Sequence, residues 1–193
     1  MPSHHRTGAP RRVHEIFAAT LDLLCEQGYA GLTIEGVAER SGVNKTTIYR
    51  WWPSKGALVG GALLGVRELE LRPPDTGSLR GDLEELMHTV CTLLSTPPAA
   101  QIAIATLGAV THSDDLAGYV HDFLADRLGR ERVIFERAVR RGELDRSLDP
   151  MLLVDLLTGA AWVRVVFRGL AVDDAFVHDA VATVLDSVDR RST

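Results

Sequence analysis

The chain has 193 residues, of which 46% are hydrophobic and 24% charged, so it has enough apolar side chains for a core without disulfides. Its two cysteines, Cys25 and Cys91, lie in apolar helical patterns, which favours buried thiols in a reducing compartment. The first ten residues lack the apolar run of a secretory signal, and the longest apolar run, residues 151–167, is shorter than the ~20 residues of a membrane helix. We therefore expect a cytoplasmic protein with no membrane partner.

The formal net charge of −5 is unevenly distributed along the chain. Residues 1–56 contain seven Lys/Arg and five Asp/Glu, whereas the remaining residues contain 14 and 21. A weakly basic N-terminal segment followed by an acidic one predicts that any affinity for nucleic acid is confined to the N-terminal end.

Apolar residues recur with helical spacing almost throughout, and strand-like alternation never persists, so the sequence predicts an all-α protein of about nine helices. The motif described below contributes two short ones. The others are expected at about residues 10–27, from 54 towards Pro73-Pro74, and over 78–95, 98–110, 113–141, 149–167 and 173–191. Gly28 and Gly142 are expected to end helices, and Asp149-Pro150 to begin one.

The segment from Thr33 to Arg50 has the pattern of a helix-turn-helix. Thr33 and Asn44 are good N-caps for two short helices, and Gly42 between them can adopt a positive φ. The inward positions carry Ile34, Val37, Ala38, Val43 and Ile48. In this motif the N-terminal end of the second helix enters the DNA major groove.

The exposed positions of the second helix suit this role. Lys45, Thr46 and Thr47 occupy its first turn, where side chains reach base edges, while Tyr49 and Arg50 suit flanking phosphates. Arg50 equally suits a surface pair with a nearby acid. Lys55 lies in the first turn of the next helix, where the helix dipole disfavours a cation, and a DNA phosphate nearby would compensate.

The run Thr33-Ile34-x-x-Val37-Ala38-x-x-Ser41-Gly42-Val43-x-x-x-Thr47-Ile48-Tyr49-x-x-Trp52-x-x-Lys55-x-x-Leu58 resembles the signature of the TetR family of bacterial regulators. The resemblance implies an all-helical homodimer with three DNA-binding helices and a ligand-binding, dimerising body. It also implies that Thr33, Tyr49 and Lys55 contact phosphates, and that Lys45, Thr46, Thr47 and Trp51 face the groove. Trp52 matches an aromatic core position. Glu35 departs from the pattern, so we expect little readout from the first motif helix. Trp51 either packs on the sugar-phosphate backbone or covers the core.

The central helices carry apolar residues that suit either core packing or the lining of an effector pocket. The candidate lining consists of Met87, Val90, Leu94, Ile104, Leu107, Phe123, Phe135 and Trp162. The expected effector is a small apolar or amphipathic molecule.

The segment 149–168 is apolar around most of its circumference, and residues 173–190 carry a broad apolar stripe. A helix that is hydrophobic on all sides has to be buried on all sides. We therefore expect both segments to pair with their copies in a symmetric homodimer.

The seven histidines are scattered, and no metal-ligand spacing, Walker loop, dinucleotide-binding motif or nucleophile elbow is present. The sequence therefore predicts no metal, no cofactor and no enzymatic activity. It predicts a DNA-binding domain at 1–56, an effector-binding and dimerisation domain at 57–193, and a repressor that a small molecule releases from a pseudo-palindromic operator in double-stranded DNA. An activator, or a ligand-binding or scaffold protein of the same fold without specific DNA binding, are the alternatives.

Overall fold

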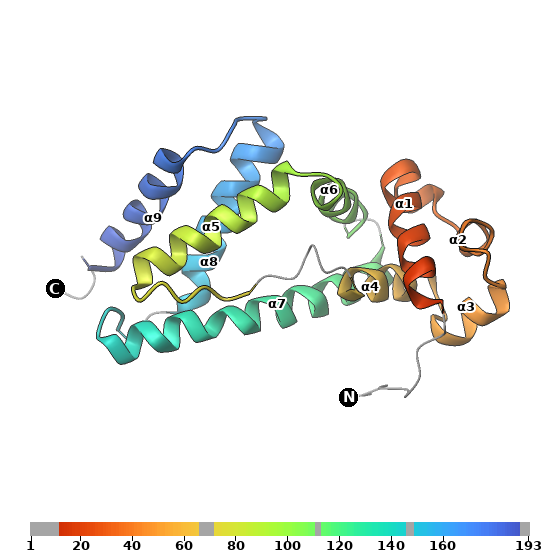
Figure 1. The fold of residues 1–193 in the computed structure, drawn as a ribbon, viewed down its shortest axis with the longest axis horizontal. Coiled ribbons are helices and arrows are strands. Elements are labelled where there is room, and N and C mark those ends of the chain that lie inside the picture. Colours follow the sequence, from red (N-terminus) through yellow and green to blue (C-terminus); the bar gives the residue numbers. More distant parts are fainter. Residues whose placement is uncertain (1–11, 66–71, 111–112, 146–148, 190–193) are drawn as a thin grey trace. The chain divides into compact units, whose positions relative to one another are not determined.

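The computed structural model describes residues 12–65, 72–110, 113–145 and 149–189, apart from the side chains of 187–189. Within these ranges all regular structure is helical, as predicted (Figure 1). The helices are α1 (Val13–Gly31), α2 (Ile34–Ser41), α3 (Lys45–Trp51), α4 (Lys55–Gly65), α5 (Leu79–Ser95), α6 (Ala99–Val110), α7 (Asp114–Arg141), α8 (Pro150–Trp162), the π-helical segment η2 (Val163–Phe167) and α9 (Asp174–Asp189).

The chain folds into two compact units. Unit 1 comprises residues 1–67 and 101–123, and unit 2 comprises residues 68–100 and 124–193. The DNA-binding domain predicted at 1–56 therefore lies within unit 1, together with most of α6 and the first turns of α7. The boundary predicted at residue 56 separates a DNA-binding function from effector binding and dimerisation. The division into compact units does not test that assignment of function.

Several predicted helix boundaries are confirmed by the backbone and its caps. Asp149 Oδ1 accepts a hydrogen bond from Met151 N with Pro150 in the first turn, and Gly142 has a φ of 75° after the last turn of α7. Gly28 has a φ of 67° and non-helical geometry, so the regular helix that begins at Val13 is interrupted there as predicted, and a short helical stretch then continues α1 to Gly31. The expected continuation of α4 towards Leu69 lies outside the described residues.

Unit 1 is built around α1, which packs against α2 and α4. Ile16, Leu24, Val37 and Leu58 are fully buried in this core. Two glycines of α4, at positions 56 and 60, lie against the first turns of α7: a Cβ on Gly56 would collide with Asp115, and one on Gly60 with Tyr119. The glycines therefore allow α4 and α7 to approach closely.

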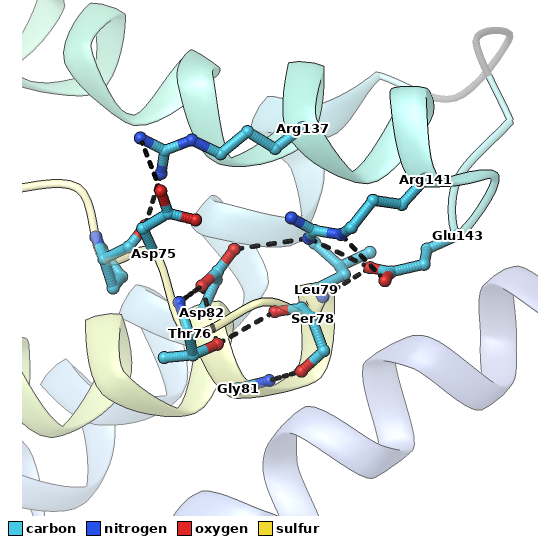
Figure 2. A network of polar contacts seen from close by, with 10 residues as sticks. Asp75, Thr76, Ser78, Leu79, Gly81, Asp82, Arg137, Arg141 and Glu143 are labelled. Atoms are coloured by element: carbon cyan, nitrogen blue, oxygen red, sulfur yellow. Dashed lines mark hydrogen bonds and ion pairs between the residues drawn. The ribbon is translucent and has the colours of Figure 1, made fainter.

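Unit 2 packs α5 against α8 and α9. A polar network joins the start of α5 to the end of α7 (Figure 2). Arg141 contacts Glu143 at 2.9 Å and Asp82 at 3.5 Å, and Glu143 accepts a hydrogen bond of 2.6 Å from Leu79 N. Arg137 donates to the carbonyl of Pro74. The network holds the C-terminal part of α7 in a defined position on α5.

The apolar segment 150–167 was expected to be one helix and too short to cross a membrane. The backbone instead changes from α to π geometry at Val163, and among the described residues this 18-residue segment has the length and mean hydropathy (1.6) of a membrane span. Length and composition alone support that assignment. Only 22% of the segment is fully buried within the chain, and its exposed residues include Leu152, Leu156, Val163 and Phe167.

Candidate nucleic-acid interface

The two motif helices, α2 and α3, are capped by their own side chains. Thr33 Oγ1 accepts a hydrogen bond from Gly36 N at 3.1 Å, and Asn44 Oδ1 accepts one from Thr46 N at 2.8 Å. Gly42 ends α2 with a φ of 64°, and Val43 N bonds back to the carbonyl of Ala38. These bonds satisfy helix-end groups locally and give the turn one defined shape.

The position of α3 on unit 1 is set by its inward residues. Ile48 is fully buried, as the sequence predicts. Trp52 was expected to be a core residue, but it is only half-buried, and its ring meets the edge of Phe17 with a centroid distance of 5.3 Å. The indole stays near the surface because it packs over α4, where a Cβ on Gly61 would lie 2.6 Å from its ring nitrogen.

Six of the predicted DNA-binding residues lie on α3 itself. Lys45, Thr46, Tyr49 and Arg50 are exposed, while Thr47 and Trp51 are half-buried. The Arg50 guanidinium lies 5.8 Å from the centre of the Trp51 ring. The short helix thus presents donors, hydroxyls and an aromatic ring to solvent over the two turns that follow Asn44, which is the chemistry that base edges and phosphates require.

Glu35 contributes to this surface in a specific way. Its carboxylate forms an exposed ion pair with Lys45, with Nζ and Oε1 3.6 Å apart. The acid on α2 therefore holds the first lysine of α3 and opposes the approach of a phosphate. Exposed pairs of this kind are weak, so an incoming phosphate can displace the carboxylate.

Lys55 is half-buried and directed towards the end of α1. Its Nζ donates a hydrogen bond of 2.7 Å to the carbonyl of Tyr29 and lies 4.3 Å from the centre of the Tyr29 ring. Burial lowers the pKa of this ammonium below its ordinary value. The carbonyl and the ring of Tyr29 thus compensate, within the chain, the unfavourable interaction of the Lys55 charge with the dipole of α4. A phosphate contact by Lys55 remains a prediction.

Two arginines that sequence reasoning did not single out support the motif. Arg12 Nη1 donates to the carbonyl of Gly42 at 3.0 Å, so the start of α1 holds the turn between α2 and α3. Arg40 forms a bidentate pair with Glu26 at 2.7 and 2.8 Å, and these hydrogen bonds lower the pKa of the Glu26 carboxyl. Both contacts join segments 14 or 30 residues apart, which helical periodicity does not reveal.

The start of α7 is bonded to the same unit. Ser54 Oγ accepts from Ala57 N, capping α4, and donates to Asp115 Oδ2 at 2.7 Å. Ser113, whose hydroxyl accepts from Leu116 N, also bonds the Tyr29 hydroxyl at 3.2 Å. Position 113 was expected to begin a helix, but its link to Tyr29 was not predicted.

The eight candidate effector residues are divided between the two units. Met87, Val90, Leu94 and Phe135 are buried in unit 2, where Trp162 is half-buried. Ile104 and Leu107 are exposed on α6 of unit 1, and Phe123 is half-buried there. Among the described residues, no group of three or more His, Cys, Asp or Glu is arranged to hold a metal ion.

Two segments of the chain match models of known protein families. Residues 16–62 match the model of the tetR family of bacterial regulatory proteins, and residues 73–184 match the tetracyclin repressor-like C-terminal domain. The chain belongs to the TetR family. It is 31% identical over 173 residues to the DNA-binding transcriptional repressor TetR of Mycobacteroides abscessus, covering 88% of this chain and 90% of that one.

Two solved structures share the fold of this chain. The TetR family transcription regulator SCO0332 is 37% identical, with a TM-score of 0.71 over 92% of this chain and 98% of the other. FadR of Bacillus subtilis, solved in complex with stearoyl-CoA, is 18% identical, with a TM-score of 0.68 over 89% and 97%, and shows the fold alone. The family consists of DNA-binding regulators and not enzymes, which confirms the function class predicted from the motif.

Proposed function

We propose that this TetR-family regulator is a cytoplasmic, homodimeric repressor that a small molecule releases from a pseudo-palindromic operator. The observation that carries the DNA-binding part is the capped, exposed helix α3. Thr33 and Asn44 fix α2 and α3 before DNA arrives, so binding loses little conformational freedom. The repressor of Mycobacteroides abscessus supports the direction of regulation.

In the proposed complex the N-terminal end of α3 enters the major groove. Lys45, Thr46 and Thr47 address base edges and the thymine methyl, while Thr33, Tyr49 and Lys55 contact phosphates. Arg50 and Trp51 follow the flanking backbone. To contact DNA, Lys45 first breaks its ion pair with Glu35. This step costs little free energy because both side chains are more than half exposed.

The proposed dimer interface lies on α8 and η2. Leu153, Val154, Leu157 and Ala161 are buried within unit 2, which packs α8 against α5 and α9. The opposite side of the same segment carries a row of exposed apolar residues at helical spacing: Leu152, Leu156, Val163 and Phe167, the last 71% exposed. A second copy is the occupant that covers this row on both chains at once.

A membrane is a poorer occupant for this segment. Its packed side is already covered by α5 and α9, and the charged Asp155 and Arg164 interrupt it. Arg164 is also occupied within unit 2, since it donates to the carbonyl of Ala171 at 2.9 Å and lies over the Phe176 ring. Helix α9 contributes less to the proposed interface than its sequence stripe suggests, because Val177, Val181 and Val184 are buried within unit 2.

The proposed effector site lies among the buried apolar residues of unit 2. Met87, Val90, Leu94 and Phe135 provide the apolar lining typical of ligand pockets, and the acyl-CoA complex of FadR supports the use of this fold to bind small molecules. We infer that α7 transmits occupancy, because Ser113 and Asp115 at its start are bonded to Tyr29 and Ser54 in the DNA-binding unit.

The proposal is tested by a gel shift with duplex DNA from the region upstream of the protein's own gene, with and without cell-extract metabolites. We expect a shifted complex that competes poorly with a scrambled duplex, a footprint with two-fold symmetry, and release by the extract. The two half-sites should lie about one helical turn apart, ~34–36 Å or somewhat more. Absence of a specific shift at low salt would contradict the DNA-binding part, and a shift unaffected by any extract would contradict effector release.

A further inference from the structure

Unit 2 contains two buried carboxyl groups with contrasting surroundings. Asp82 on α5 is fully buried, and its Oδ1 accepts hydrogen bonds from the backbone N (2.6 Å) and hydroxyl (2.8 Å) of Thr76. Its other oxygen accepts no hydrogen bond but forms an ion pair with Arg141 at 3.5 Å (Figure 2). The fold therefore provides this acid with hydrogen-bond donors at one oxygen and a counter-charge at the other.

Glu131 on α7 is buried to the same degree, with 2% of its surface exposed, but neither carboxyl oxygen has a hydrogen-bond partner. Burial raises the pKa of this carboxyl above its ordinary value. A buried polar group without a partner is rare in folded proteins because it loses its hydration and gains nothing in return. Glu131 is therefore a group that the chain itself leaves unsatisfied.

The buried neighbours that follow Glu131 on α7 are apolar. The buried face of this helix in unit 2 continues through Ile134, Phe135 and Ala138, none of which has a polar side-chain atom to offer. Arg127, which is also buried, lies one turn earlier on α7, and no hydrogen bond joins it to Glu131.

We propose that Glu131 is the polar anchor of the effector site and that the effector is an apolar molecule carrying a protonated amine. This inference rests on the proposed effector control. An ammonium group with two or more N–H donors satisfies both carboxyl oxygens, whereas a hydroxyl donates to only one. Ligand pockets combine an apolar lining with a few such groups, and buried Phe135 lies next to Glu131 on the same helix face.

The charge of unit 2 agrees with a cationic ligand. Residues 68–100 and 124–193 contain 13 Arg and 18 Asp/Glu, a formal net charge of −5. An excess of negative charge raises the local concentration of cations and disfavours anions such as fatty acids.

The test uses three probes with one chain and different head groups: octylamine, octanol and octanoate. Their binding is measured by calorimetry at pH 7 with the full-length protein and the variants Glu131→Gln and Glu136→Gln, the second removing an exposed acid from the same helix. For wild type and for Glu136→Gln, we expect octylamine to bind at least about tenfold more tightly than octanol. Glu131→Gln should bind octylamine no more tightly than octanol. If Glu131→Gln does not fold, Glu131→Met replaces it with an apolar chain of similar size.

Equal binding of octylamine to wild type and Glu131→Gln would overturn the proposal, as would no binding of octylamine or a preference for octanoate. Operator binding is measured separately by gel shift, where octylamine should release wild type but not Glu131→Gln. A protein that binds octylamine through Glu131 but no operator would refute the proposed repressor and leave the ligand site standing. A repressor that extract releases while octylamine does not bind would refute only this inference.

Discussion

The helix-turn-helix and the helical body differ in how completely the chain satisfies its own groups. In the first, Thr33 and Asn44 cap their helices, and Arg12 and Arg40 hold the turn and α2 through hydrogen bonds. In the body, Glu131 lacks a partner and an apolar row on α8 lacks cover. Under the proposals above, the helix-turn-helix needs no other molecule to satisfy its groups, whereas the body requires a second copy and a ligand.

The largest expected effect comes from breaking the proposed dimer. Leu156→Glu places a charge in the exposed row on α8, so burying that row against a second copy becomes unfavourable. We expect a monomer by analytical ultracentrifugation and a loss of operator affinity of about a hundredfold or more, because only one half-site is engaged. The control Leu124→Glu changes an exposed leucine of α7 and should leave both properties intact. A Leu156→Glu dimer with normal affinity would refute this interface.

The next two variants separate base contacts from phosphate contacts in the proposed DNA complex. Thr46→Ala should weaken operator binding by about tenfold and leave non-specific DNA unaffected, since it removes the proposed base contact. Lys55→Met keeps the stem over Tyr29 but removes the charge, so it should weaken all sequences alike and reduce the salt slope by about one unit. Fluorescence anisotropy over a salt series measures both. If Lys55→Met left affinity and slope unchanged, the hydrogen bond to Tyr29 would be its whole role.

A smaller effect is expected in the pH dependence of stability. The pKa of Glu131 is raised in the folded protein, so the native state holds this proton more tightly than the unfolded chain does. Wild type should therefore lose free energy of unfolding relative to Glu131→Gln as the pH rises from the ordinary glutamate pKa through the raised one. Urea unfolding of both proteins between about pH 4 and pH 8 measures the difference. A constant difference would show that the carboxyl has a partner in solution.

The smallest expected effect is on stability and tests the side-chain cap at the start of α3. Asn44→Ala removes the side-chain acceptor of Thr46 N and should lower the free energy of unfolding by about 1 kcal/mol, whereas Asn44→Gly should cost only a few tenths. Urea denaturation detects the difference between them. If both variants were as stable as wild type, the hydrogen bond from Thr46 N would contribute nothing to α3.

The sequence by itself determined the helices, their caps and the motif, because these depend on residues within one or two turns of each other. Thr33, Gly42 and Asn44 carry their roles in their own chemistry, and the predicted all-α fold and family are both confirmed. Gly28 also interrupts the first helix where the sequence predicts, although a short helical stretch follows it as far as Gly31.

Only the tertiary structure decided how those groups are paired. The bonds from Arg12 to Gly42, from Lys55 to Tyr29 and from Ser54 to Asp115 join residues 26 to 61 positions apart, so no periodicity predicts them. The same holds for the two buried acids of unit 2: Asp82 and Glu131 each follow a helical pattern, but the turn before α5 supplies one with partners and the apolar face of α7 leaves the other without. Long-range packing determines which polar groups remain available for a ligand.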